Sequence, residues 1–354
     1  MIPIYKPYMP KSITSGIEEI LYSGQLGFGK YGIQFENQLK KFIGCEYLLT
    51  ISSYNQAMQI VLSTLGLKNG DEIIASPVSC LASNQPFAVK GLKIIWADVN
   101  PKTGGMNQDD VKQKITKNTK AIFHNHFCGY LGDIDAINAI GEEFGIPVID
   151  DAIEAFASEY KGKKVGNLGT DLTVFSFQTV RLPNTIDGGA ICFKNKETYE
   201  KAKLIRDYGI ERSSFRTATG EINSNYDITL EGYAGLMSEL NSYIGGRQMD
   251  DIENLLIIQK DNAMIWNEKL ANSKSIKSLE ITPESMPNYW VYGTLCKNKT
   301  DAIKIFRENT FYATGVHINN NVYSVFNNKT VLKGVNEFMN HFVAIPCGWW
   351  FNNK

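Results

Sequence analysis

This chain of 354 residues lacks the features that mark several large classes of protein. Its six cysteines have no paired spacing, which argues against a disulfide framework or a zinc site and predicts reduced, mostly buried thiols. The 36 basic and 37 acidic residues are interleaved, so no basic stripe indicates nucleic acid and no polybasic run indicates a membrane surface. No apolar run approaches the roughly 20 residues of a spanning helix, and the opening MIPIYKPYMPKSI has no signal-peptide core. We therefore expect a soluble cytoplasmic protein that binds neither nucleic acid nor a membrane.

The chain does have a regular alternation of strand-like and helix-like segments. Short apolar, β-branched runs predict strands at Tyr47–Ile51, Glu72–Ala75, Lys93–Ala97, Lys120–Phe123, Pro147–Ile149, Leu172–Phe177 and Ala190–Phe193. Helical patterns lie between most of them, at Gln56–Leu65, Asp109–Ile115, Asp133–Phe144 and Lys196–Tyr208. Such alternation over roughly 200 residues predicts an α/β layer fold with a mainly parallel sheet.

The pattern changes after Gly245-Gly246. A long amphipathic stretch, 249–270, precedes a helix-like segment at 301–309 and a strand-like one at 314–318. We predict a large domain over residues 1–245 and a smaller C-terminal α+β domain over residues 246–354. The polar segment 213–230 predicts a long surface loop.

Polar side chains follow several of the predicted strands at their carboxyl ends. Asp150 and Asp151 could bind a metal, act as a base, pair with a protonated ring nitrogen, or merely cap a helix. Ser52 and Ser53, before a helix start, could hold an anion on free backbone N–H groups, or serve as a cap. His126 could touch a ligand, although a lone histidine is more often structural. Their common place at strand ends predicts a ligand site, because α/β sheets bind ligands there.

Longer stretches then follow in a familiar order: SGQLGFGKYGIQFE, GDEIIASPVSCLASNQPF, KITKNTKAIFHNHFCG, VIDDAIEAFASEYKGKKVGNLG, FSFQTVRLPNTIDGGAI and TGVHINNNVYSVF. Over nearly the whole chain they resemble the DegT/DnrJ/EryC1/StrS family. The resemblance implies the fold-type-I aminotransferase fold and a relation to pyridoxal-phosphate (PLP) enzymes, mostly sugar-nucleotide aminotransferases of surface-polysaccharide biosynthesis. It places the aspartate that pairs with the cofactor's pyridine nitrogen at Asp151. Ser176, in FSF, would contact the phosphate, as would the turn that contains Tyr54 and Asn55.

The resemblance also places the family's Schiff-base lysine at Arg181. A guanidinium stays protonated, with a pKa above about 12, so it forms no Schiff base. It also cannot shuttle the proton that transamination requires, a task for a group that titrates near neutrality. A plainer role for Arg181 is a salt bridge to Asp151, Asp187 or Glu154 that neutralises a vacated anionic pocket.

Other positions depart from the family's pattern. Tyr54 and Gln56 replace a glycine and a small residue in the phosphate turn. Glu154 replaces a glutamine beside the cofactor's phenolate oxygen, and Leu81 replaces an aromatic residue that stacks on the ring. Ser238 stands where a neighbouring subunit usually lends an asparagine to the phosphate.

The resemblance implies a sugar-nucleotide site near the polar loop that follows residue 213 and near His317, Asn319 and Asn320. In the most similar subgroup, an arginine and an aspartate occupy the positions of Asn319 and Asn321. Substrate contacts are therefore either lost or altered, and the sugar and nucleotide remain open.

Three functions follow from these residues. Arg181 argues against an ordinary sugar aminotransferase. The chain could be a pyridoxamine-phosphate (PMP) or PLP enzyme that modifies nucleotide sugars without a covalent link to lysine, with Arg181 as a clamp on a phosphate or oxyanion. It could also be a pseudo-aminotransferase that only binds a ligand, which the many altered positions favour. We expect PLP or PMP, if bound, to be held weakly and non-covalently, and we expect no metal.

We predict that the chain forms a dimer with a large apolar interface. The reason is the resemblance, because the family builds each active site from two subunits and Met237–Ile244 lies in the segment that would cross over. A homodimer is the first expectation, and a heterodimer with an active paralogue stays open. Light scattering at micromolar concentration should give twice the mass of one chain, and a monomer would contradict the prediction.

Overall fold

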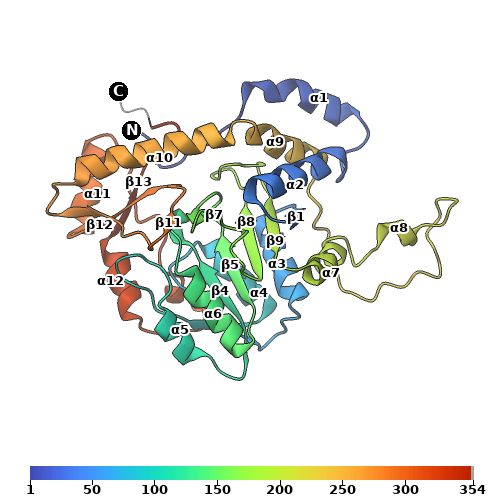
Figure 1. Ribbon diagram of the computed structural model, residues 1–354, viewed down its shortest axis with the longest axis horizontal. Helices are drawn as coiled ribbons and strands as arrows, with labels where there is room; N and C mark the ends of the chain where they lie inside the picture. The colour runs from blue at the N-terminus through green and yellow to red at the C-terminus, as the bar shows by residue number, and fades with distance from the viewer. Residues whose placement is uncertain (352–354) are drawn as a thin grey trace.

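The computed structural model describes residues 1–351 and is centred on a seven-stranded sheet (Figure 1). The order is β1-β9-β8-β5-β4-β2-β3, in which β9 runs antiparallel to both neighbours and the other neighbouring pairs are parallel. The strands are β1 (Tyr47–Ile51), β2 (Glu72–Ala75), β3 (Lys93–Trp96), β4 (Thr119–Asn125), β5 (Val148–Ala152), β8 (Leu172–Ser176) and β9 (Gly189–Phe193). The predicted α/β fold with a mainly parallel sheet is confirmed.

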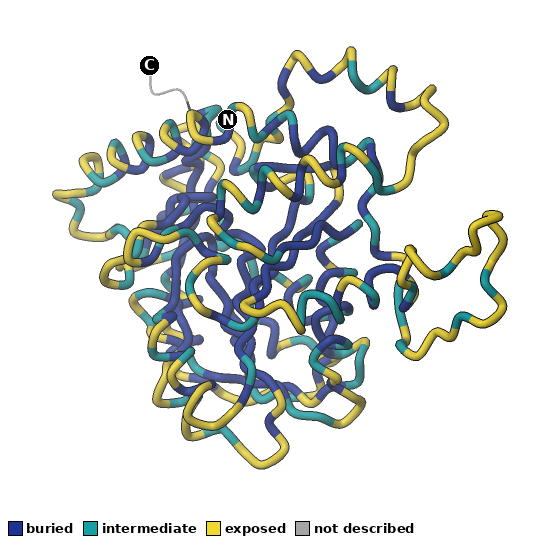
Figure 2. Tube along the Cα trace, turned by 45° about the vertical axis from the view of Figure 1, so that its right-hand side comes forward, coloured by how far each residue is buried: buried dark blue, intermediate teal, exposed yellow. Residues whose placement is uncertain are grey.

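Helices cover both faces of this sheet. One face packs against α3 (Tyr54–Thr64), α4 (Leu81–Lys90) and α7 (Lys196–Arg206) in the largest hydrophobic cluster. The other face packs against α2 (Lys30–Ile43), α5 (Gln108–Lys114) and α6 (Ile134–Phe144). Every residue of β5, β8 and β9 is therefore buried, and the strands lie inside the molecule in Figure 2. This explains why their sequences read as nearly continuous apolar runs.

The C-terminal part forms a second, smaller layer at the left of Figure 1. Its antiparallel sheet has the order β10-β12-β13 and packs with long α10. The elements are α10 (Ile252–Leu270), β10 (Ile276–Ser278), β12 (Tyr292–Cys296), α11 (Lys299–Glu308), α12 (Lys333–His341) and β13 (Phe342–Ile345). Helix α9 (Glu239–Met249) runs across the predicted boundary at residues 245 and 246, so the two-domain division stays a prediction.

The segment 314–318 is not the strand that its sequence predicts. Only Thr314 makes a bridge, to Ala344, and Val316 then turns the chain with a φ of 61°. A β-branched residue rarely adopts this left-handed conformation, so the apolar run predicted the wrong structure. The turn directs His317 toward the large domain, where it contacts Glu154.

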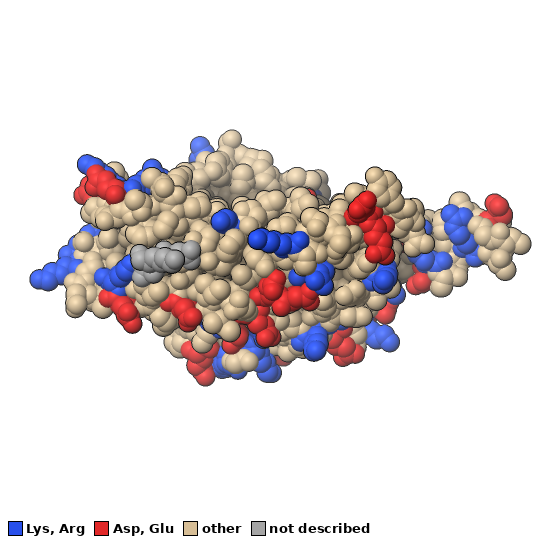
Figure 3. All heavy atoms as spheres, turned by 90° about the horizontal axis from the view of Figure 1, so that it is seen from above, with Lys and Arg blue, Asp and Glu red and all other residues tan. Residues whose placement is uncertain are grey.

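The N-terminal helix α1 (Thr14–Tyr22) and the loop around α8 (Arg212–Phe215) lie at the periphery. Residues 211–230 include no buried residue and form the arm that projects at the right of Figure 1. The short strands β6 (Glu159–Tyr160), β7 (Lys163–Lys164) and β11 (Ser285–Met286) complete a small third sheet. Basic and acidic side chains are intermixed on the face in Figure 3. Within residues 1–351, no helix has both the length and the apolar character needed to cross a membrane.

Candidate functional site

Three of the predicted site positions, Tyr54, Asp151 and Ser176, meet at one edge of the central sheet. The register pairs Asn125 with Asp151 across β4 and β5, and Ser176 with Gly189 across β8 and β9. Because side chains alternate between the faces of a strand, Asn125, Asp151 and Ser176 share the face that packs against α3. Helix α3 begins at this edge with Tyr54, so the site lies between strand ends and a helix N-terminus.

The carboxylate of Asp151 lies at the centre of the site and is fully buried. The Tyr54 hydroxyl donates a hydrogen bond to Oδ1 at 2.7 Å, and the Asn125 amide donates to Oδ2 at 2.6 Å. The Ile153 N–H group also donates to Oδ1, at 3.2 Å. Burial raises the pKa of Asp151 above its ordinary value, and the neighbouring Ser83 hydroxyl together with these donors opposes the rise. Both carboxylate oxygens are thus engaged by groups of the protein itself.

Tyr54 owes its position to the start of α3. Ser53 caps the helix by accepting from the Gln56 N–H group at 3.1 Å, and Tyr54 is the first helical residue. Gly189 allows the close approach of β9, because a β-carbon there would lie 2.8 Å from the Phe175 carbonyl oxygen and 3.2 Å from the Tyr54 α-carbon. The Tyr54 side chain is completely buried, and burial beside Asp151 raises its pKa well above the ordinary value.

Arg181 lies in the loop between β8 and β9, with only 6 % of its surface exposed. Its Nη2 atom is 3.6 Å from Glu154 Oε1, and its guanidinium lies over the Trp290 ring at 4.3 Å. The Trp290 indole N–H donates to the Val180 carbonyl at 2.9 Å, which fixes the loop next to Arg181. The expected salt bridge therefore forms with Glu154. The Nε and Nη1 atoms of Arg181 are buried without a hydrogen-bond partner.

Glu154 joins Arg181 to the C-terminal layer. His317 Nε2 lies 2.8 Å from Glu154 Oε1, and the Cys128 N–H group donates to Oε2 at 2.7 Å. Burial alone would raise the pKa of Glu154, but His317 and Arg181 outweigh it and hold that pKa below its ordinary value. The structure thus brings His317, placed by sequence in the substrate region, to the same cluster as Arg181.

Three residues of the site went unnoticed in the sequence. Tyr5 stacks on Trp290 at 4.6 Å, and burial together with Glu154 raises its pKa. Neither aromatic residue lies in a recognisable motif. Asn125 had a usable signal, because its place at the end of β4 puts it beside Asp151 on the same face of the sheet.

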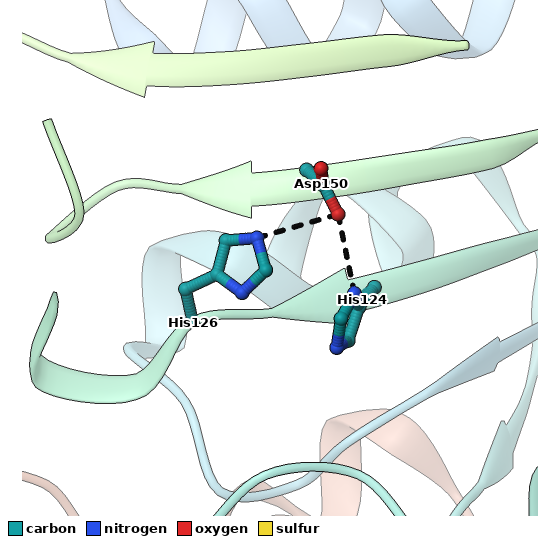
Figure 4. Close-up of side chains that lie close together, drawn as sticks. All are labelled: His124, His126 and Asp150. Carbon is teal, nitrogen blue, oxygen red and sulfur yellow. Dashed lines mark hydrogen bonds and ion pairs between the residues drawn. The ribbon is translucent and has the colours of Figure 1, made fainter. Parts of the chain in front are cut away.

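His126 is not part of this cluster. His124 Nδ1 lies 3.2 Å from Asp150 Oδ1 and His126 Nε2 lies 3.3 Å from the same oxygen, all three side chains being fully buried (Figure 4). Asp150 and Asp151 lie on opposite faces of β5, and the face that carries Asp150 packs against α5 and α6. The sequence expectation that His126 acts in the site therefore has no geometric support.

The arrangement of His124, His126 and Asp150 also suits hydrogen bonding better than metal binding. His126 Nδ1 accepts from the Gly132 N–H group at 3.4 Å, which places the proton of a neutral ring on Nε2. That atom then faces the carboxylate as a donor and offers no lone pair to a metal ion. Burial lowers the pKa of His124, and despite burial the two imidazoles hold the pKa of Asp150 below its usual range.

Leu81, Asn319 and Asn320 lie close to the start of α4. Leu81 is the first residue of α4 and is 39 % exposed. The buried Asn320 amide donates to the Ser79 carbonyl at 3.0 Å, so it fixes the turn before α4. Asn319 donates to Asn321 Oδ1 at 2.6 Å.

The remaining candidates are Asn55, Ser176 and Ser238. Asn55 is exposed in the first turn of α3. Ser176 is buried and accepts from the Gln178 N–H group at 3.3 Å. Ser238 caps α9 by accepting from the Asn241 N–H group at 3.1 Å. No contact places Ser238 with Asp151, and its expected role toward a neighbouring subunit stays a prediction.

Comparison with known proteins identifies the family of this chain. A model of the DegT/DnrJ/EryC1/StrS aminotransferase family matches residues 7–351. The chain belongs to this family. The resemblance seen in the sequence is thereby confirmed over nearly its whole length.

The uncharacterized protein MJ1066 of Methanocaldococcus jannaschii is 29 % identical over 282 residues, which span 80 % of this chain and 72 % of that protein. The sugar aminotransferase CalS13 of Micromonospora echinospora has a TM-score of 0.93 at 26 % identity, covering 100 % of this chain and 96 % of that one. A GDP-4-keto-6-deoxymannose-3-dehydratase solved with a PLP-glutamate geminal diamine shares the fold, with a TM-score of 0.87, 20 % identity and coverage of 98 % and 96 %. PLP-type cofactors are thus found among the solved neighbours.

The residues present do not fit such a cofactor as the sequence resemblance would place it. Tyr54, Asn125 and Ile153 already occupy the oxygens of Asp151. Within residues 1–351 no lysine is buried, whereas Arg181 is. A ring bonded to Asp151 would have to displace Tyr54 from the interior.

We predict that Glu154→Gln lowers the free energy of unfolding at pH 7 by about 3 kcal/mol, because it leaves Arg181 buried without its ion-pair partner. The pKa of Glu154 is lowered in the folded state, so its contribution is fully present above the ordinary value of 4.5 and is lost as the pH falls through the lower folded value. Urea unfolding from pH 7 to pH 3 should therefore show the difference from wild type shrinking below about pH 4.5.

The matched control is Glu280→Gln. Glu280 also lies 3.6 Å from its cationic partner, Lys102, but both side chains are exposed. Its substitution should change stability little at any pH. Equal effects of the two substitutions would show that the Arg181–Glu154 pair has no special weight.

Proposed function

We propose that this chain is a DegT/DnrJ/EryC1/StrS homologue of nucleotide-sugar metabolism that has lost transamination and acts as a ligand-binding subunit or pseudo-aminotransferase. One observation carries the proposal: Arg181, at the position where the sequence resemblance places the Schiff-base lysine, is buried, paired with Glu154 and stacked on Trp290. A guanidinium held in this way is neither a nucleophile nor a proton shuttle.

The lysines of the chain support this view. Within residues 1–351 every lysine is at least partly exposed, and Lys164 packs its ammonium over the Phe42 ring at 4.7 Å, in the small third sheet. A Schiff-base lysine needs a depressed pKa, which comes from desolvation or a neighbouring cation. No described lysine combines such burial with a place near Asp151.

The proposed ligand is a nucleotide-sugar-like small molecule, and the proposed assembly is a cytoplasmic homodimer or a heterodimer with an active paralogue. PLP or PMP would bind only weakly and without a covalent link. A ligand could approach from the side of His317, which keeps 20 % of its side chain exposed while the carboxylate behind it is buried.

A second candidate function has an observation of its own. The Nε and Nη1 groups of Arg181 are buried without partners, and unsatisfied guanidinium donors are suited to hold a phosphate or a developing oxyanion. A PLP- or PMP-dependent enzyme that modifies nucleotide sugars without a lysine link would use Arg181 in this way. Binding of cofactor to the wild-type protein distinguishes it from the first proposal.

We predict that the purified protein shows no lysine-bound PLP absorption band before or after addition of PLP. Borohydride reduction followed by peptide mass spectrometry should find no stoichiometric pyridoxyl-lysine, because no lysine reaches the site. CalS13, a sugar aminotransferase of the same fold, serves as the positive control. A stoichiometric adduct on Lys164, or on any other lysine, would mean that the catalytic position is misplaced and would restore the aminotransferase function.

We predict that Arg181→Lys alone stays colourless with PLP, and that colour returns when Tyr54→Gly and Gln56→Ala are added. The single change supplies an amine but leaves Tyr54 on Asp151. The triple variant should bind PLP at least about tenfold more tightly than the Arg181→Lys variant does. This corresponds to a binding free energy that is more favourable by about 1.4 kcal/mol. Arg206→Lys is the control, since Arg206 is equally buried but pairs with Glu36. Full PLP binding by the Arg181→Lys variant would favour the second candidate.

A further inference from the structure

The Tyr54 side chain makes a contact that helix α3 does not need in order to form. Ser53 already provides the cap of α3. The Tyr54 side chain instead crosses to Asp151, 97 positions further along the chain, and its hydroxyl donates to the carboxylate at 2.7 Å. Tyr54 is among the largest side chains that are fully buried. The contact therefore belongs to the site and not to the helix cap.

The hydrogen bonds of Asp151 leave little room for another donor. A carboxylate offers about four lone-pair positions, and Tyr54, Asn125 and Ile153 use three of them. Asp151 itself has no exposed surface and Asn125 is 3 % exposed. Because Asp151 is fully buried, an outside group can reach its carboxylate only by displacing side chains that now pack around it.

The Tyr54 side chain has the chemical form that such a position requires. A phenol is a flat six-membered aromatic ring with one donor at its edge, and a protonated pyridine ring has the same shape and donates through nitrogen. Each can place its donor on one carboxylate oxygen while its ring packs in an apolar interior. Tyr54 packs in the cluster of Ile51, Ala57 and Met58.

We infer that Tyr54 is a built-in occupant of the ring position: its phenol takes the place on Asp151 that a cofactor ring takes in relatives. The inference rests on the proposed function, since it explains how the site keeps a buried carboxylate without a cofactor. Asn125, which donates to the second oxygen, completes the pairing. The site is then a closed polar core that is specific for a phenol.

Removal of the side chain tests this directly. Tyr54→Ala should leave a ring-sized cavity with the Asp151 carboxylate at its end. The probe is p-cresol, which is the side chain of tyrosine as a free molecule, and toluene is the same molecule without the hydroxyl. We expect p-cresol to raise the melting temperature of Tyr54→Ala and, by calorimetry, to bind at least about tenfold more tightly than toluene, because only p-cresol can pair with the carboxylate.

The matched control is Phe87→Ala. Phe87 is also fully buried in the same cluster, and it lies edge-on to Phe123 at 4.9 Å. Its cavity should prefer toluene, since an apolar cavity binds apolar molecules and an unpaired hydroxyl is costly there. Equal preference for p-cresol and toluene in the Tyr54→Ala cavity would overturn the inference.

Tyr54→Phe keeps the inference testable if Tyr54→Ala does not fold. It retains the ring and removes only the donor to Asp151, so the folded-state pKa of Asp151, already raised, should rise further. The stability deficit of Tyr54→Phe should then be largest at pH 7 and shrink in acid as Asp151 becomes protonated. A deficit that does not change with pH would overturn the inference. The proposed function has its own test, since a stoichiometric pyridoxyl-lysine adduct in the wild-type protein would contradict it.

Discussion

The burial of one carboxylate governs the arrangement of this site. An ionised side chain removed from water is costly unless it is hydrogen-bonded, so Asp151 requires donors wherever it lies inside the protein. Tyr54 from α3 and Asn125 from β4 supply them. The same two bonds tie a helix start and a neighbouring strand to the end of β5. The requirement of Asp151 thus fixes the relative position of three elements.

A second group of buried polar side chains contains Arg181 and Glu154. The Glu154 carboxylate lies between Arg181 and His317. The three residues come from three separate loops, one of which belongs to the C-terminal layer. Their pairing lets the positive group remain in a nearly dry interior, although two of the guanidinium donors stay unsatisfied. Trp290 covers the guanidinium and anchors its loop through the Val180 carbonyl. The packing of the small layer on the large one and the chemistry of the site are therefore linked.

The two neighbouring aspartates show how strand geometry separates roles. Asp151 faces α3 and meets Tyr54, whereas Asp150 faces the opposite side and meets His124 and His126. One step along a strand turns the side chain through the sheet. Each face thus has a buried carboxylate with its own donors.

The sequence alone determined the α/β fold and the family, and it singled out Asp151 and Arg181, because periodicity and motif order are local properties. It did not determine which carboxylate would form the ion pair with Arg181, since Asp151, Asp187 and Glu154 were equal candidates. It also did not predict that Tyr54 would reach Asp151 or that the segment 314–318 would turn. Contacts between residues 97 or 163 positions apart depend on how the layers pack, and local patterns do not contain that information. Only the tertiary structure decided that the interior is closed by its own side chains.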